Sequence, residues 1–189
     1  MARVLLGIVL GVVLAPLCVL GWFRFGHPPV AVLDKPFPME EQMARPALAK
    51  RIAREATQKP AIQADEATLV AGAEVYRDSC AACHGLHNRN APFAAHMYPR
   101  APQLWEKHAN SNVVGVSDDP PAETYWKVAN GIRLTGMPAY KDLLTDLEIW
   151  QVSLLLANAD KPLPPAAIAI LHPTTQPVLP PDLTQKTKP

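Results

Sequence analysis

Cysteine, glycine and charged residues are all scarce in this sequence. Its 189 residues include three cysteines and nine glycines, and charged residues make up 19%. Three cysteines are too few for a disulfide framework, and an odd number leaves one unpaired. The formal net charge of +1 excludes the basic surface that nucleic-acid-binding proteins carry over a whole chain. Strict alternation of apolar and polar residues is also missing, so the sequence predicts helices rather than strands.

The few charges are distributed unevenly along the chain. Residues 1–64 hold eight Lys/Arg and four Asp/Glu, which gives +4. Residues 65–160 hold seven and twelve, which gives −5, and residues 161–189 hold three and one, which gives +2. This division indicates three environments, and the length suits one compact domain with appendages.

An uncharged apolar run opens the chain. It comprises the 20 residues from Val4 to Phe23 and is flanked by Arg3 and Arg24. As a helix it would measure about 30 Å, the thickness of the hydrocarbon core of a bilayer. The alternative is a cleaved signal peptide, but its apolar core is usually shorter, and no A-x-A-like cleavage site follows this run. We therefore predict a transmembrane anchor over residues 1–25.

Proline-rich segments flank the middle of the chain. Residues 26–64 contain six prolines and are predicted to form a linker. A short helix is expected within it, starting at Pro46 and continuing over Ala47–Gln58, because proline suits the first helical position and good helix formers follow. Residues 161–189 contain eight prolines and few bulky side chains. Such a composition cannot build a core, so we expect an extended tail.

The acidic middle of the chain has the pattern of an all-α domain. Apolar residues recur at a helical period over residues 64–78. A second helix is expected over residues 122–130, with Gly131 at its end. A third begins at Thr145, where Glu148 three residues later completes a capping box.

The strongest motif is Cys80-Ala81-Ala82-Cys83-His84, a C-x-x-C-H sequence that occurs once. This is the attachment signature of c-type haem, in which two thiols add to the vinyl groups of one porphyrin and the adjacent imidazole binds its iron. A redox C-x-x-C would need a βαβ context that the sequence does not predict. A zinc site that included His87 would lack a distant second pair of ligands. We therefore predict one haem c, covalently bound through Cys80 and Cys83 with His84 as the proximal ligand.

The segment GAEVYRDSCAACHG, which runs from Gly72 to Gly85, resembles the start of a class I cytochrome c. In that family a glycine and an aromatic residue stand eight and four residues before the first haem cysteine, and Gly72 and Tyr76 match them. They contact the C-terminal helix, for which Trp150 and Leu154 are candidates. The resemblance covers about residues 65–160 and implies the class I cytochrome c fold.

The resemblance also implies a second axial ligand. Thr135-Gly136-Met137-Pro138 is similar to the methionine-ligand loop of the family, and a thioether raises the reduction potential of haem iron. Met97, His96 and His108 are competitors, but Met97 follows His84 by only 13 residues and lacks the glycine and proline setting. We therefore predict that His84 and Met137 bind the iron.

Four further residues are candidates for contact with the haem. Pro102 and Leu104 lie in a segment that resembles the family's proline loop, whose proline carbonyl accepts a hydrogen bond from the proximal histidine. Pro99 is an alternative, because prolines are dense here. Arg100 and Arg133 flank the two ligand loops and are candidates to pair with haem propionates.

The stretch ETYWKVANGIRLTGMPAY resembles membrane-bound monohaem cytochromes and the cytochrome subunits of bacterial respiratory or dehydrogenase complexes. This resemblance implies an electron-transfer protein rather than an enzyme, acting either as a carrier or as a subunit of an oxidoreductase complex. It implies a single span in the bacterial inner membrane, with the haem domain in the periplasm. The negative charge of the domain favours a basic docking surface on a membrane-bound redox partner.

Two other function classes remain open at the level of sequence. If the sixth ligand is absent or labile, the domain could bind gases or act as a peroxidase-like protein. A structural subunit with an inert haem is the third interpretation, supported only by the tail and by the Gly7/Gly11 pair in the apolar run, which has the spacing of helix-packing glycines.

Overall fold

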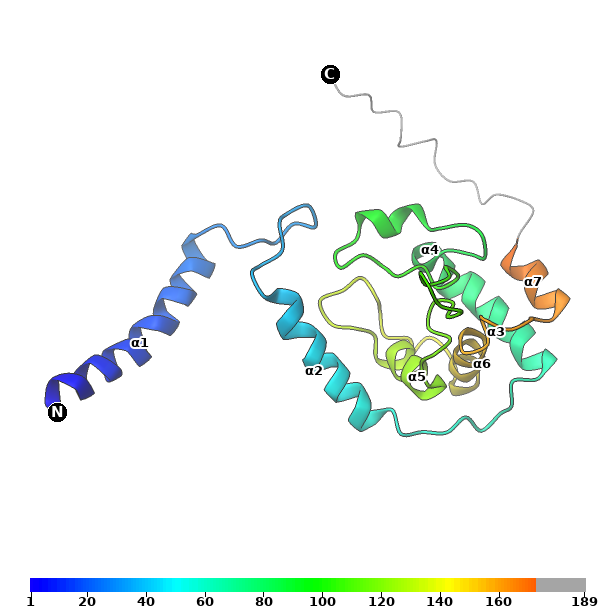
Figure 1. The fold of residues 1–189 in the computed structure, drawn as a ribbon, viewed down its shortest axis with the longest axis horizontal. Coiled ribbons are helices and arrows are strands. Elements are labelled where there is room, and N and C mark those ends of the chain that lie inside the picture. Colours follow the sequence, from blue (N-terminus) through cyan, green and yellow to red (C-terminus); the bar gives the residue numbers. More distant parts are fainter. Residues whose placement is uncertain (173–189) are drawn as a thin grey trace, which may run out of the picture. The chain divides into compact units, whose positions relative to one another are not determined.

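A computed structural model of the chain describes residues 1–172 (Figure 1). The described residues contain no strand, only two isolated bridges, so the predicted all-α class is confirmed. The described residues divide into two compact units, 1–47 and 48–172. The elements in chain order are α1 (Ala2–Phe25), α2 (Glu40–Glu55), α3 (Glu66–Ser79), α4 (Ala81–His84), η1 (Pro92–His96), α5 (Pro121–Asn130), α6 (Asp146–Leu156) and α7 (Pro165–Leu171).

The first unit is dominated by α1, whose residues are almost all exposed. Among the described helices, α1 is the one that is long and apolar enough to cross a membrane. A signal sequence near an N-terminus can also be long and apolar enough to meet this criterion. Pro16 lies inside α1, and Gly26 ends it by donating its N–H to the carbonyl of Trp22.

Helix α2 starts six residues before the position that the sequence predicts. It begins at Glu40, whose side chain accepts the N–H of Phe37 at 2.9 Å, and Pro46 lies inside it rather than at its start. A proline within a helix removes one hydrogen bond but leaves the helix intact where neighbouring residues hold it. In the second half of α2, Ile52 is only 4% exposed.

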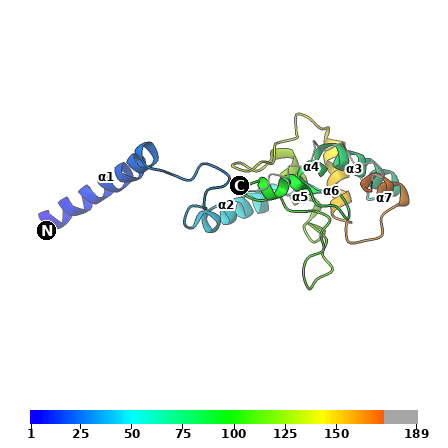
Figure 2. The same ribbon diagram turned by 90° about the horizontal axis from the view of Figure 1, so that it is seen from above.

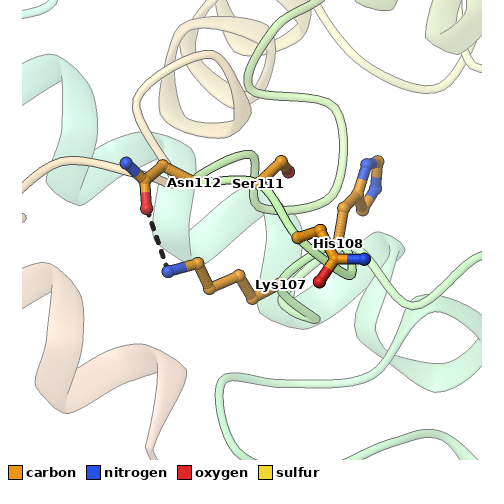
Figure 3. Close-up of a pocket in the computed structure, with 5 residues that line it drawn as sticks. Lys107, His108, Ser111 and Asn112 are labelled. Carbon is orange, nitrogen blue, oxygen red and sulfur yellow. Dashed lines mark hydrogen bonds between the residues drawn. The ribbon is translucent and has the colours of Figure 1, made fainter.

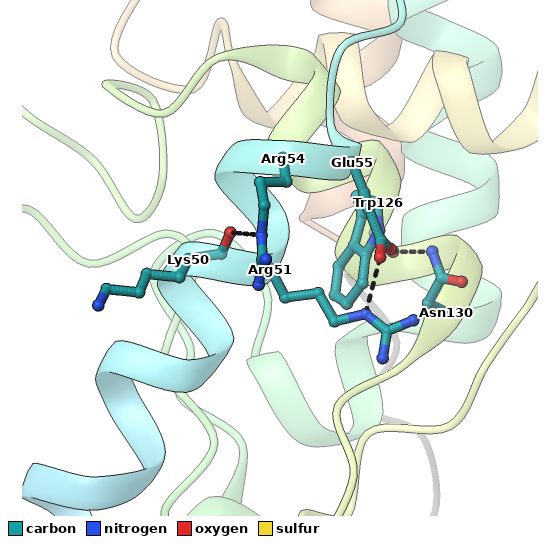
Figure 4. A network of polar contacts seen from close by, with 6 residues as sticks. All are labelled: Lys50, Arg51, Arg54, Glu55, Trp126 and Asn130. Carbon is teal, nitrogen blue, oxygen red and sulfur yellow. Dashed lines mark hydrogen bonds and ion pairs between the residues drawn. The ribbon is translucent and has the colours of Figure 1, made fainter.

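Polar contacts connect the end of α2 with α5 (Figure 4). The indole Nε1 of Trp126 donates a hydrogen bond of 2.9 Å to the Glu55 carboxylate. The other oxygen of the same carboxylate lies 2.9 Å from Nε of Arg51. The second half of the predicted linker helix is therefore part of the second unit and packs against it.

The core of the second unit forms where α3 packs against α6 and α7, while α5 packs on α6. Figure 2 shows α3 beside α6 and α7. A Cβ atom on Gly72 would lie 2.4 Å from the carbonyl oxygen of Gln151, so α3 and α6 approach closely at this glycine. Tyr125 stacks on Trp150 with 4.2 Å between ring centroids. Gly72 therefore faces the C-terminal helix as predicted, but the atoms nearest to its Cβ position belong to Gln151 and Leu155 and not to the candidates Trp150 and Leu154.

The ends of these helices follow the sequence signals closely. Asp65 caps α3 by accepting the N–H of Thr68 at 2.8 Å. Gly131, with φ of 65°, ends α5. The capping box between Thr145 and Glu148 at the start of α6 is complete.

Helix α7 replaces the first part of the tail that we predicted to be extended. Pro165 occupies its first turn, where a missing N–H has no cost, and its Ala167 and Leu171 side chains are fully buried. Burial against α3 stabilises a helix that its proline-rich surroundings do not suggest. The rest of the tail prediction, over residues 173–189, lies outside the described residues.

Candidate haem-binding site

The C-x-x-C-H residues form one tight turn at the end of α3. Cys80 follows α3 directly, and its carbonyl accepts the N–H groups of Cys83 and His84 at 3.2 and 3.0 Å. Both thiols are free and partly exposed. Gly85 leaves the turn with φ of 75°, and a Cβ atom there would lie 2.6 Å from Oε1 of Gln103. The turn therefore presents two thiols and one imidazole from a short segment that a neighbouring loop fixes.

The imidazole of His84 is oriented by a backbone carbonyl. Its Nδ1 lies 2.8 Å from the oxygen of Pro102, as the resemblance implied, and the alternative Pro99 makes no such contact. Since a carbonyl only accepts, Nδ1 carries the proton, and Nε2 keeps its lone pair for a metal. Burial lowers the pKa of His84, and the hydrogen bond to Pro102 opposes this effect in part. The ring is thus held in the neutral form that binds iron.

Gln103 organises the loops around this turn, a role that the sequence did not suggest. Its Oε1 accepts the N–H of Ala91 at 2.6 Å. Its Nε2 donates to the carbonyl of Cys83 at 3.1 Å, and Gln103 itself is buried. A polar residue between Pro102 and Leu104 carries no local signal, because its role depends on partners more than ten residues away. The N–H of Leu104 adds a further link, to the carbonyl of His84 at 3.1 Å.

The loop that carries Met137 is held by its own hydrogen bonds. The Thr135 hydroxyl donates to the carbonyl of Ile132 at 2.7 Å and accepts the N–H of Met137 at 3.1 Å. The hydroxyl of Tyr140 donates to the carbonyl of Ser79 at 2.6 Å, beside the first haem cysteine. Met137 is partly buried and packs against the core cluster that also contacts Cys80. The loop is therefore tied to the end of α3 where the C-x-x-C-H turn begins.

Met97 also reaches this loop, which its position in the sequence did not predict. Its side chain packs against a small cluster of alanines that Cys83 also contacts. A Cβ atom on Gly136 would lie 2.4 Å from Cε of Met97. Two thioether side chains are thus close to the candidate site, one on the Met137 loop and one in contact with it.

The remaining candidates lie at the surface. Arg100 and Arg133 are exposed, and within the described residues neither pairs with a carboxylate. His108, a competitor for the sixth position, lines a surface hollow of about 420 Å³ with Lys107, Asn110, Ser111 and Asn112 (Figure 3). That hollow contains none of the residues expected to bind haem.

The donor set fits a covalent haem better than a metal ion. Residues 1–172 contain no group of three or more His, Cys, Asp or Glu side chains that could hold a metal ion. Burial and the nearby Cys83 raise the pKa of the Cys80 thiol to about 12. A thiol held in the protonated form is a slow redox nucleophile. Two thiols, a carbonyl-oriented imidazole and a thioether on a loop tied to the same turn are instead the groups that a c-type haem needs.

Comparison with protein families gives one match, which spans the candidate site. Residues 67–154 match the family described as "Cytochrome C oxidase, cbb3-type, subunit III". Comparison with curated proteins and with solved structures found no match. The matched residues contain the C-x-x-C-H turn, the Pro102 loop and the Met137 loop, whereas α1, α2 and α7 lie outside them.

Proposed function

Because residues 67–154 are a cytochrome c domain of the cbb3 oxidase subunit III family, we propose that the chain is a membrane-tethered one-electron carrier with a His/Met-ligated haem c. The haem, when bound, supplies the Fe(II)/Fe(III) couple. Cys80 and Cys83 would hold it covalently, and His84 and Met137 would bind its iron. The observation that carries the proposal is the 2.8 Å contact between His84 Nδ1 and the Pro102 carbonyl.

This ligand set favours electron transfer over chemistry on a substrate. The Pro102 carbonyl fixes the ring of His84, so one axial position has a preorganised donor. The Thr135 hydroxyl accepts the N–H of Met137, so the second donor lies on a loop that hydrogen bonds hold in place. If both donors bind the iron of a covalently held haem, the chain would keep the same two ligands in both oxidation states, which favours electron transfer.

We further propose a location and a partner. In this proposal α1 anchors the chain in the bacterial inner membrane, the haem domain lies in the periplasm, and a membrane-bound redox complex exchanges electrons with it. The chain acts as a carrier or as a fixed subunit of that complex. The −5 charge of residues 65–160 favours a basic docking surface on the partner.

A pair of methionine variants tests the ligand assignment. The oxidised, reduced and carbon monoxide-treated reduced spectra are recorded for the detergent-solubilised protein, for Met137→Ala and for Met97→Ala. We expect CO to change the spectrum of Met137→Ala alone, because only this variant opens a coordination position. A CO response in Met97→Ala alone would assign the sixth position to Met97. A clear CO response in the unaltered protein would replace the carrier by the gas-binding or peroxidase-like alternative.

The salt dependence of electron transfer tests the docking surface. If a basic partner attracts the acidic domain, the second-order rate of electron transfer falls as ionic strength rises, because salt screens charges beyond about 10 Å at 0.1 M. A basic soluble redox protein and a neutral small-molecule reductant serve as reference reactants. A rate that is flat or rises with salt would contradict the basic docking surface and leave the haem assignment unaffected.

A further inference from the structure

The segment that follows α1 exposes an unusual number of large apolar side chains. Leu33 is 92% exposed and Val30 is 87% exposed. Four other large apolar residues between positions 30 and 43 are also exposed: Val32, Phe37, Met39 and Met43. A soluble surface carries single exposed apolar residues, whereas several in one short segment mark a site of interaction with a partner or a membrane.

Aromatic contacts join this segment to the end of α1. The ring of Phe37 lies 5.9 Å from that of Trp22, and Trp22 also contacts Phe23 at 5.0 Å. Tryptophan at the end of an apolar helix is typical of the boundary between lipid and water. The chain therefore returns to the C-terminal end of α1 at Phe37 and does not lead directly away from that end.

Several backbone N–H groups of the segment are either absent or paired within it. Prolines at positions 28, 29, 36 and 38 have none. Asp34 accepts the N–H groups of Val30 and Ala31 at 2.8 Å each, and Glu40 accepts that of Phe37 at 2.9 Å. An unpaired backbone group is costly where water is scarce, so this arrangement suits a layer that is only partly hydrated.

We propose that residues 30–43 lie in the boundary between headgroups and acyl chains of the membrane that α1 spans, with the partner being the lipid surface itself. The Arg24 guanidinium lies over the Phe25 ring, 5.3 Å from its centroid, and Lys35 stands between Leu33 and Phe37 in the sequence, so both charges suit contact with lipid phosphates. The charges of Asp34 and Lys35 place the segment at the boundary and not deeper. The inference rests on the membrane anchor of the proposed function and not on the haem.

Lipid is favoured over a protein partner by the connection to α1. Val30 follows Phe25, the last residue of α1, by five positions. At about 3.5 Å per residue the chain between them spans less than about 20 Å. An aromatic contact that returns Phe37 to Trp22 keeps the middle of the segment equally close to the helix end.

Depth measurements with nitroxide labels test the proposal on the full, haem-loaded chain in nanodiscs of phosphatidylcholine and phosphatidylglycerol. Labels are placed singly by Leu10→Cys, Leu33→Cys and Leu134→Cys in a Cys18→Ser background. Leu134 is the matched control, because it is a leucine of the haem domain that is 90% exposed, close to the 92% of Leu33. Collision with oxygen is compared with collision with a water-soluble nickel chelate.

We expect the Leu10 label to collide with oxygen and hardly with the chelate, and the Leu134 label to do the opposite. The Leu33 label should collide with the chelate several-fold less often than the Leu134 label. Adding Phe37→Ser should raise the chelate accessibility of the Leu33 label, because the contact with Trp22 is lost. Equal chelate accessibility at Leu33 and Leu134, with Leu10 protected, overturns the inference and keeps the anchor.

A chelate-accessible Leu10 label, or loss of the N-terminal residues in the intact mass, overturns the anchor and the inference together. The visible spectrum of each sample reports separately on the haem, so a failure of the electron-transfer proposal is recognised independently.

Discussion

Two glycines near Met137 differ in what surrounds them. Gly131 has φ of 65°, and a Cβ atom there would lie 2.7 Å from backbone atoms of Pro138 and Ala139. Gly136 is exposed, and the one atom close to its Cβ position is the end of the flexible Met97 side chain. The same substitution therefore meets rigid backbone at one position and a movable methyl group at the other.

We expect Gly131→Ala to lower the free energy of unfolding by about 2 kcal/mol or more, since the left-handed conformation alone costs about 1–2 kcal/mol for a residue with a Cβ atom. Gly136→Ala should cost less than about 1 kcal/mol, because Met97 can change rotamer. Denaturant unfolding of the two variants, followed by haem absorbance, measures both values. Equal losses would mean that Met97 is held rigidly against the loop.

At the scale of residues, functional groups on neighbouring residues could be predicted from the sequence, whereas contacts between distant segments could not. Five neighbouring residues were enough to predict the C-x-x-C-H turn, and a short motif led to the Pro102 carbonyl that contacts His84. The approach of Met97 to Gly136 depends on the path of the intervening loops. Such an approach has no signature in the local sequence.

At the scale of elements, the crossing of α3 and α6 depends on a single missing side chain. A Cβ atom on Gly72 would meet the backbone oxygen of Gln151 at 2.4 Å, and neither helix can move without disturbing the core. We expect Gly72→Ala to destabilise the protein by at least about 1 kcal/mol, although alanine gains about 1 kcal/mol of helix propensity. Glu74→Ala, at an exposed position of the same helix, should change stability by less than about 0.5 kcal/mol. Calorimetric unfolding compares the two, and a neutral Gly72→Ala would show that the crossing tolerates extra volume.

Both crossing helices begin with a carboxylate whose pKa is lowered. Hydrogen bonds from Thr68 lower the pKa of Asp65 below its usual 3.8, and hydrogen bonds from Thr145 lower that of Glu148 below its usual 4.5. A lowered pKa in the folded state stabilises the protein above the unfolded value, and this contribution is lost as the pH falls through the folded value. We therefore expect the unfolding temperature to fall on acidification below about pH 4.5. The variant Asp65→Asn/Glu148→Gln cannot titrate at these positions and should show a shallower fall, whereas an identical acid slope would assign the effect to other carboxylates.

The elements that the sequence predicted well are those with local signals. The capping box of α6 and the glycine after α5 operate within four residues, so the sequence contained all the information needed. Helix α7 is different, since its two buried side chains are covered by α3, almost a hundred residues earlier. The start of α2 was also mispredicted, because the capping by Glu40 competes with the proline signal at Pro46.

At the scale of the molecule, the packing of α2 shortens the flexible connection to the haem domain. The predicted linker of 39 residues, 26–64, would span about 30–40 Å as a flexible chain. With α2 formed, residues 26–39 are the part of this linker that precedes the helix, and the same relation gives about 20 Å for them. If α1 is the membrane anchor proposed above, the chain between the anchor and α2 is therefore shorter than the full linker that the sequence predicts.

Hydrogen exchange tests whether α2 is part of the haem domain. Ile52→Ala removes a buried side chain, and such truncations cost about 2–5 kcal/mol. We expect exchange of the amides of residues 48–55 to become at least about tenfold faster, while α6 keeps its protection. Lys50→Ala, at an exposed position of the same helix, is the control and should leave exchange unchanged. Unchanged exchange in Ile52→Ala would mean that α2 is held by its polar contacts alone.

The burial of Leu171 and Ile52 shows that the compact unit is longer than the segment that matches the cytochrome family. Similarity to the cytochrome family ends at residue 154 and begins at residue 67, yet the side chains of Ile52, Leu163, Ala167 and Leu171 are all buried. An excised fragment of residues 67–154 would leave the partners of these side chains facing water. The compact unit that contains the candidate haem site therefore includes the second half of α2 and helix α7, whose buried side chains lie outside the segment that matches the family.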